Sequence, residues 1–225
     1  MVGDREAPGK PVAEPWMTTA ADYESWYATP RGRWIADTEF ALMLKMLRPD
    51  AGATVLDVGS GTGHFSRRLA ALDLDVVSVD PDMGMLAYAR SADDTIPAIG
   101  ADARALPFAD STFDYCIAIT SLCFVEPPAR ALAEMWRVCR QGAFLGLLNR
   151  RSVLHAKKRG HGGYRGARWD TRRSVQGWTA ALRPRPSVAC ASAVFLPGGR
   201  RLARQVESWL PSRLLWGGFL AVMLR

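Results

Sequence analysis

The chain has 225 residues, of which 48% are hydrophobic and 23% charged, and this composition suits one folded domain with a sizeable core. No apolar stretch approaches the ~20 residues that a membrane-spanning helix needs, and the first residues lack the apolar segment of a signal peptide. We therefore expect a cytoplasmic protein without a membrane span, in which residues 1–17 form a disordered leader.

Charge is distributed unevenly along the chain. Residues 1–150 carry 14 basic and 20 acidic residues, whereas residues 151–225 carry 15 basic and 2 acidic ones. A basic last third favours an anionic substrate, a nucleic acid or an anionic membrane surface. Because 25 of the 29 basic residues are arginine, a general compositional bias is the alternative explanation. The four cysteines lack metal-site spacing, so we predict reduced thiols and no bound metal.

The pattern of apolar residues predicts the elements in chain order. Residues 18–48 read as two helices broken at Pro30 and Gly32, the second with an apolar stripe at helical spacing. Short apolar strands then alternate with helices. We expect strands at 54–59, 75–80, 97–102, 113–120 and 143–149, and helices at 64–72, 82–91 and 128–140. Such alternation is typical of a doubly wound parallel sheet that binds ligands at the carboxyl ends of its strands.

The last third has a different pattern. The stretch from 150 to 169 is basic, glycine-rich and aperiodic, which predicts a loop or lid. A helix follows, capped by Asp170 or Thr171. Two late strands, 187–196 and 217–225, flank an amphipathic piece and are expected to lie antiparallel at one edge of the sheet.

The glycine-rich turn after the first strand, "DVGSGTG" at 57–63, limits the ligand. It lacks the GxxxxGK[ST] of nucleoside-triphosphate loops, and the third glycine of a dinucleotide fingerprint would fall on His64. A dinucleotide brings a pyrophosphate to the start of the helix, where its dipole favours negative charge. An acid two residues before the glycines instead suits a ligand that carries an ammonium group.

With "VLDVGSGTG", "VVSVD" followed by "PDMGML", "GADARALPFADSTFDYCIAI" and "ALAEMWRVCRQGAFLGLLN" in this order, the chain resembles the class I S-adenosylmethionine (SAM)-dependent methyltransferases. The last segment is similar to their E-x-x-R-V-L-x-P-G-G stretch. Glu134, Arg137, Val138 and Gly142 match it, while Cys139, Gln141 and Ala143 depart from it. The resemblance covers residues 54–149, and the pattern after residue 120 is most similar to the small-molecule group that includes the ubiquinone and menaquinone biosynthesis enzymes.

The resemblance implies a fold and a domain plan. The fold would be α/β, with a doubly wound, mostly parallel seven-stranded sheet, helices on both faces and an antiparallel C-terminal edge strand. Residues 18–225 would form a single domain. Its parts would be a helical cap at 18–50, a cofactor-binding core at 51–150, a basic lid and helix at 151–186, and the C-terminal strands at 187–225.

The resemblance also assigns cofactor-binding roles. Asp57 would face the methionine ammonium, and Asp80 both ribose hydroxyls. Pro81 and Met85 would lie against the adenine face, and Thr120 would sit where the methyl group meets its acceptor. The whole implied set is Asp57, Gly59, Ser60, Gly61, Gly63, Asp80, Pro81, Met85, Asp102, Ala103 and Thr120. Buried strand ends make a ligand role natural for Asp57 and Asp80, whereas Met85 could instead pack in the core and Asp102 could cap a turn.

Methyl transfer is an in-line displacement that needs alignment and, for a protonated nucleophile, a base. The sequence shows no decisive base; the weak candidates are His155, His161 and Tyr164. We expect the substrate side to include Tyr23, Tyr27, Phe124, Arg165 and Trp169, with Trp26 and Arg33 in the same cap. The [DN]PP[YF] motif of adenine and glutamine methylation is absent, and Cys123 lacks the proline expected before a cytosine-methylating nucleophile.

The sequence therefore predicts a methyltransferase that converts SAM to S-adenosylhomocysteine (SAH) and methylates O, N or C of a small molecule, which we expect to be anionic or phenolic. An RNA methyltransferase using the basic last third is one alternative, and a non-catalytic SAM-binding protein is another. We expect a monomer or homodimer.

Overall fold

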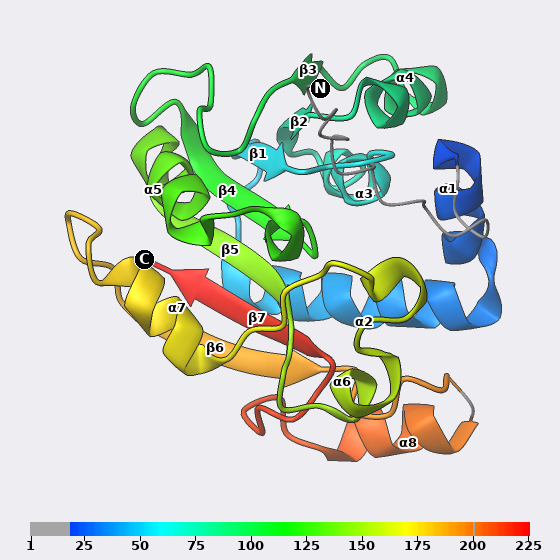
Figure 1. Cartoon of the computed structure of the whole chain (residues 1–225). Coiled ribbons are helices and arrows are strands. Elements are labelled where there is room, and N and C mark those ends of the chain that lie inside the picture. Colours follow the sequence, from blue (N-terminus) through cyan, green and yellow to red (C-terminus); the bar gives the residue numbers. More distant parts are fainter. Residues whose placement is uncertain (1–18, 200) are drawn as a thin grey trace, which may run out of the picture.

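The computed structural model describes residues 19–199 and 201–225, so the predicted leader at 1–17 lies outside the described residues. Within them, one seven-stranded sheet forms the centre of the molecule, in the order β3-β2-β1-β4-β5-β7-β6 (Figure 1). Its strands are β1 (Thr54–Val58), β2 (Asp75–Asp80), β3 (Ala98–Gly100), β4 (Phe113–Ile119), β5 (Cys139–Leu148), β6 (Val188–Ala193) and β7 (Phe219–Leu224).

Strand direction confirms the predicted fold class. The five strands β1 to β5 run parallel, whereas β7 runs antiparallel to both of its neighbours, β5 and β6. The last strand of the chain is therefore inserted between β5 and the outermost strand, β6. Because the parallel strands end at the same side of the sheet, the loops that follow β1, β2 and β4 meet there.

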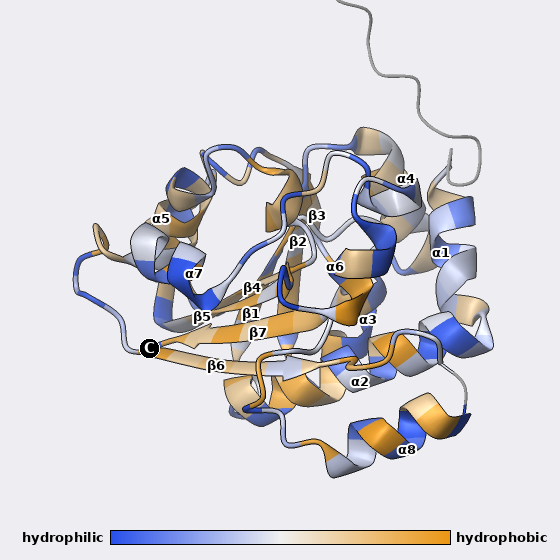
Figure 2. Cartoon of the chain, turned by 60° about the horizontal axis from the view of Figure 1, so that its bottom comes forward, coloured by the Kyte–Doolittle hydropathy of each residue, from blue (hydrophilic) through white to orange (hydrophobic). Residues whose placement is uncertain are grey.

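Helices cover both faces of the sheet. They are α1 (Ala20–Ala28), α2 (Pro30–Leu47), α3 (His64–Ala70), α4 (Met83–Ala92), α5 (Pro128–Val138), α6 (Val153–Lys158), α7 (Arg172–Thr179) and α8 (Arg201–Trp209), with two short 3₁₀ helices, η1 (Leu122–Phe124) and η2 (Gly162–Tyr164). Alternate strand residues face opposite sides, so Val55 packs with α2 and α3 while Leu56 packs with α5 and α7. Figure 2 shows the resulting apolar strands between helices whose outer faces are hydrophilic.

The two predicted helices are present and separate at Thr29–Pro30, but Gly32 takes no part in the break. Thr29 is the N-cap and Pro30 the first residue of α2, a position that needs no amide hydrogen. Gly32 lies inside the helix, where a Cβ atom would stand 2.0 Å from the carbonyl oxygen of Trp26. The two helices therefore join through a tight corner that places α1 beside α4 (Figure 1).

Two other expectations need correction. The helix predicted to reach residue 140 ends at Val138, and strand β5 begins at once at Cys139. The stretch 150–169 is not aperiodic loop throughout, since Ser152 caps α6 by accepting a hydrogen bond from the His155 amide, and η2 follows. In the part of the chain that the structure describes, no helix is long and apolar enough to cross a bilayer.

Candidate active site

The glycine-rich loop after β1 is held against the end of β2. The amides of Gly59 and Ser60 donate to the Val79 carbonyl at 2.8 and 3.0 Å. Gly59, Gly61 and Gly63 all have positive φ angles, of 73°, 56° and 75°. At Gly59 a side chain is also excluded by space, because a Cβ atom would lie 2.3 Å from that of Ser121. The backbone here can therefore approach a ligand closely.

Asp57 lies beneath this loop. Its side chain is buried and accepts a 2.6 Å hydrogen bond from the Ser66 hydroxyl, which in turn accepts from Ser78. Burial raises the pKa of Asp57 to about 7, against the opposing effect of the Ser66 hydrogen bond. The carboxyl thus ties α3 to the sheet from below. Its expected role toward the methionine ammonium stays a prediction.

Asp80, by contrast, faces the loop. At the end of β2, its carboxylate accepts hydrogen bonds from the amides of Gly61 at 2.9 Å and Asp82 at 2.8 Å. Within the described residues it forms no ion pair, so its remaining lone pairs are available to hydroxyl donors. Nearby, the hydroxyl of Ser60 is buried and has no hydrogen-bond partner among residues 19–199 and 201–225. An acceptor aimed at the loop and an unpaired hydroxyl fit a ligand with ribose hydroxyls and an amino acid part.

The predicted adenine face lies at the start of α4. Pro81 is exposed and Met85 is half-buried, whereas Met83 leaves 57% of its surface exposed. The Met83 sulfur also packs so close to Gly100 that a Cβ atom there would lie 2.8 Å from it. Apolar atoms therefore remain open beside Asp80, which fits a flat aromatic ring.

Asp102 is engaged by a neighbour. It accepts hydrogen bonds from the Arg104 amide at 2.8 Å and from two guanidinium nitrogens, and these contacts lower the pKa of Asp102 to about 2. This arrangement is the turn cap that the sequence left open as an alternative. The adjoining Ala103 is 9% exposed. Recognition of adenine by this pair stays a prediction.

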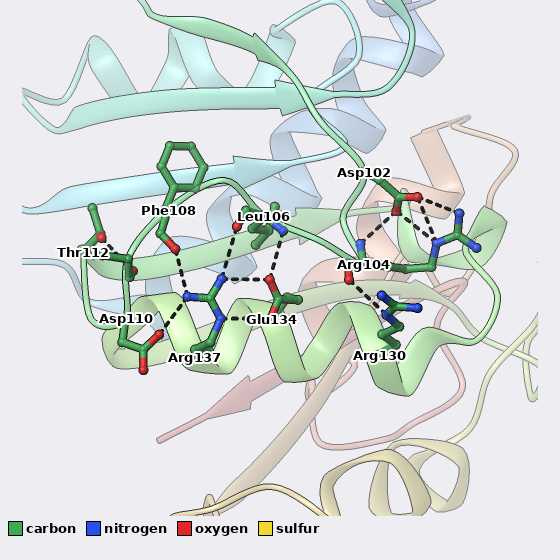
Figure 3. A network of polar contacts seen from close by, with 10 residues as sticks. Asp102, Arg104, Leu106, Phe108, Asp110, Thr112, Arg130, Glu134 and Arg137 are labelled. Carbon is green, nitrogen blue, oxygen red and sulfur yellow. Dashed lines mark hydrogen bonds and ion pairs between the residues drawn. The ribbon is translucent and has the colours of Figure 1, made fainter.

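The loop that carries Asp102 is anchored from α5 (Figure 3). Glu134 accepts from the Leu106 amide at 2.9 Å and from the guanidinium of Arg137. Arg137 also donates to the carbonyls of Leu106 and Phe108 and to Asp110. Glu134 and Arg137, the matched residues of the E-x-x-R motif, therefore fix the loop after β3 by hydrogen bonds to its backbone.

Helix α1 closes over the glycine loop through Glu24, which the sequence did not single out. Glu24 accepts from the Thr62 hydroxyl, from Arg67 at 2.7 Å and is 3.2 Å from His64 Nδ1. Burial raises the pKa of Glu24, but the hydrogen bonds with His64 and Thr62 outweigh it and lower the pKa overall. Tyr27 stacks on the His64 ring at 3.7 Å. The predicted cap is thus fastened at the site, while Arg33 is exposed and lies outside the cavity wall.

A cavity of about 480 Å³ lies beside Thr120, the residue after β4. Its wall brings together several predicted residues, namely Tyr23, Trp26, Tyr27, Phe124, His161 and Tyr164. It does not include His155, Arg165 or Trp169. His155 packs edge-on against Trp169 at 5.0 Å, and Trp169 in turn lies 5.5 Å from the Tyr164 ring. These two residues therefore support the wall from behind.

The basic segment after β5 is bound to the body by Arg168. Its guanidinium donates to Asp170, which is 1% exposed, to Glu126 and to the carbonyls of Leu122 and Val125. The basic and aromatic residues Tyr164, Arg165, Arg168 and Trp169 resemble an RNA-binding pattern, although the sequence favours a lid over a small molecule for this cluster. Because its donors are used within the fold, Arg168 is a structural link between the loops after β4 and β5.

The sequence reasoning also missed Glu39, which lines the cavity from α2. Ile35, Glu39 and Met43 follow one another at four-residue steps, so this carboxylate lies in the apolar stripe of the helix. That misfit was the available sequence signal. No comparable local pattern marks Glu24, since its partners lie 38 to 43 residues away.

Comparisons with known proteins agree with this geometry. A family model described as a methyltransferase domain matches residues 56–147, from β1 to β5. Over these residues the chain matches the methyltransferase domain family, as the sequence motifs predict. The methyl donor of such a domain is SAM, and the residues around Asp80 and Ser60 fit it.

The curated relatives match this chain over the methyltransferase domain and not over their full lengths. A demethylmenaquinone methyltransferase of Renibacterium salmoninarum is 45% identical over 94 residues, which are 42% of this chain and 40% of that protein. A malonyl-[acyl-carrier protein] O-methyltransferase of Pectobacterium atrosepticum is 35% identical over 103 residues, 46% of this chain and 41% of that protein. The chain thus matches less than half the length of these relatives.

Among solved structures, a SAM-dependent methyltransferase of Thermotoga maritima, described as a possible histamine N-methyltransferase, superposes with a TM-score of 0.65. It is 22% identical and is matched over 91% of this chain and 94% of its own length. At that identity the likeness shows the fold alone. The sequence family therefore identifies residues 56–147 only, whereas the elements outside this range are matched by fold.

Proposed function

We propose that this protein transfers a methyl group from SAM to a small molecule by in-line displacement, leaving SAH. The observation that supports this most directly is the position of Thr120. It lies directly after β4 and lines the cavity of about 480 Å³, and the next residue, Ser121, packs against Gly59 of the glycine loop. A small acceptor in that cavity would therefore meet the cofactor side at Thr120.

In this proposal each part of the chain has a separate task. The glycine loop and Asp80 bind the cofactor, and the apolar atoms of Met83 and Met85 cover its adenine. The aromatic residues of α1 hold the acceptor and keep water away from the reacting atoms. Holding two reactants in line supplies roughly 7–11 kcal/mol of the barrier when the geometry is good. Positioning is thus the main contribution we assign to the cavity.

The two alternatives have less support. An RNA methyltransferase needs free cations along an open groove, whereas Arg168 is used within the fold and the cavity is lined largely by aromatic and apolar residues. A non-catalytic SAM-binding protein has no need for an acceptor cavity next to Thr120. The anionic or phenolic acceptor expected from the basic last third is untested, and the Glu39 carboxylate in the cavity wall argues against an anion there.

The proposed function can be tested with methyl-labelled SAM. The protein is incubated with fractions of a bacterial lysate, and the label is sorted into RNA, protein and small metabolites. We expect label in small metabolites. Label in RNA that disappears with heparin or high salt would favour the RNA alternative, and tight SAM binding without any transfer would favour the non-catalytic one.

Asp80 provides the sharper test of the cofactor site. We expect Asp80→Ala to weaken SAM binding at least tenfold in calorimetry, because two ribose hydroxyls lose a charged acceptor. Asp75→Ala, in the exposed first position of the same strand, is the matched control and should bind SAM as the wild type does. Equal affinity of the wild type and Asp80→Ala would contradict the proposed cofactor geometry.

A further inference from the structure

The cavity beside Thr120 has an aromatic wall with one carboxylate in it. Rings from α1, η1, η2 and β7 surround the space, namely Tyr23, Trp26, Tyr27, Phe124, Tyr164 and Phe219. Glu39 of α2 joins them. Aromatic faces attract cations, and more strongly where water is excluded. The wall therefore combines two kinds of group that favour a positively charged ligand.

Glu39 has no partner within the described residues. It forms no hydrogen bond and no ion pair there, although other half-buried carboxylates such as Glu24 and Glu134 are each paired with an arginine. Burial alone raises the pKa of Glu39 to about 8, and no neighbouring cation offsets it. Glu39 is half-buried, and a partly desolvated carboxylate without a charged partner is destabilising, so its place in an apolar helix stripe needs a reason.

The cations of the cavity wall do not meet this need. Arg31 donates through Nε to the carbonyl of Pro197 at 2.7 Å, and its charge lowers the pKa of Tyr164 against the larger effect of burial. Lys158 and His161 are exposed. The hydroxyls of Tyr23 and Tyr27 are close enough to Glu39 to feel its charge. Burial raises the pKa of both tyrosines, and the negative charge of Glu39 raises it further. The positive partner of Glu39 is thus absent from the described chain.

We propose that Glu39 binds the ammonium group of a small amine, which is the methyl acceptor, and takes its proton. This inference rests on the proposed methyl transfer and adds the acceptor class and the base. The aromatic residues of α1 hold the body of the amine, and the Tyr23 and Tyr27 hydroxyls, 3.2 Å apart, border the same space.

The proton balance of the step is simple. The ammonium R–NH₃⁺ loses one proton to the Glu39 carboxylate, which becomes a neutral acid. The freed nitrogen lone pair forms a bond to the methyl carbon, and the carbon–sulfur bond breaks with its electron pair left on sulfur. The product is R–NH₂⁺–CH₃ with neutral SAH, and Glu39 returns its proton to water when the site opens. A carboxyl with a pKa near neutrality is well matched to this exchange.

The first test measures ligand preference. Three amines of increasing size (benzylamine, 2-phenylethylamine and tryptamine) are titrated by calorimetry, each beside the alcohol and the carboxylate of the same length. The protein is used alone and with SAH. We expect at least one amine to bind tenfold or more tightly than both analogues. If no amine is preferred, or if an alcohol binds equally well, the proposal is overturned.

The second test uses Glu39→Gln, which keeps the shape and removes the charge. We expect the amine preference to fall below threefold and transfer of labelled methyl to the preferred amine to fall at least 100-fold, while SAM affinity is unchanged. Asp37→Asn, an exposed carboxylate on the same helix that pairs with Arg68, is the matched control and should keep both properties. Glu39→Asp retains the charge and serves if the glutamine variant fails to fold.

Two outcomes separate this inference from the proposed function. If Glu39→Gln weakens binding of SAM but not of SAH, Glu39 faces the sulfonium and the amine proposal is wrong, although the methyltransferase remains. If the wild type prefers amines through Glu39 but binds neither SAM nor SAH, the ammonium site stands and the proposed function fails.

Discussion

At the scale of single residues, the site depends on where the backbone has no room for a side chain and where a carboxylate has no partner. Gly59 has both a positive φ and a contact with Ser121 that excludes a Cβ atom. Asp57, Asp80 and Glu39 are three carboxyls with different surroundings. The first is hydrogen-bonded in the core, the second faces the loop, and the third lies in an aromatic wall.

Gly59→Ala should damage both the fold and the cofactor site. The left-handed conformation costs an alanine about 1 kcal/mol, and the contact with Ser121 adds overpacking of about 1–3 kcal/mol. Gly52→Ala is a matched control, because Gly52 has the same φ of 73° but nothing within 4 Å of its would-be Cβ. Urea unfolding measures the difference. Equal destabilisation of the two variants would show that Ser121 can move away from the new methyl group without a measurable loss of stability.

At the scale of elements, the sequence predicts the regular core well, because long apolar strands and capped helices depend on local patterns. The helix at 172–179 begins after Thr171, one of the two expected caps. The short helix α6 and η2 were not predicted, since glycine-rich basic sequence carries little periodicity. Glu24 and Glu39 depend on contacts between distant segments, which no local pattern encodes. The glycine-rich loop was predictable because its signature lies in one contiguous stretch, residues 57–63.

The anchor of the 102–112 loop on α5 leads to a second prediction (Figure 3). Arg137→Met removes four hydrogen-bonding partners and leaves Glu134, whose side chain is 22% exposed, without its cation. We expect a loss of about 2 kcal/mol in the free energy of unfolding and weaker SAM binding, because the loop bordering the adenine side loosens. Arg140→Met breaks a more exposed pair with Asp114 and should cost under about 1 kcal/mol without changing SAM affinity. Equal effects would argue against the anchor.

At the scale of the whole molecule, the proposed function assigns the cofactor to one set of elements and the methyl acceptor to another. The cofactor side lies within the matched methyltransferase domain, between β1 and β5. The cavity is built largely outside it, by α1, α2, η2 and β7. In the proposed function the acceptor is selected by parts of the chain that the family match does not cover, which is why the sequence resemblance predicts the donor and not the acceptor.

Asp57 on the cofactor side and Glu39 in the cavity wall have no ion-pair partner in the described part of the chain. Their burial makes the stability of the fold depend on pH. The pKa of Glu39 is raised to about 8 and that of Asp57 to about 7, whereas both groups ionise near pH 4 in the unfolded chain. Between these values the folded state holds protons that the unfolded state has released. Its stability must therefore fall as the pH rises from about 5 to 8, by up to about 1.4 kcal/mol per pH unit for each group.

The difference in stability between the wild type and Glu39→Gln reports on Glu39 alone. Contributions from other titrating residues cancel in this difference. His155 is one of them, and its lowered pKa makes stability rise with pH. Urea unfolding at pH 5, 6, 7 and 8 should give the smallest difference between the two proteins at pH 5 and an increasing advantage for the variant toward pH 8. A constant difference across this range would mean that Glu39 is solvated or paired in solution. An amine bound in the cavity should reduce the loss in the wild type alone, since it supplies the cation that the folded chain lacks.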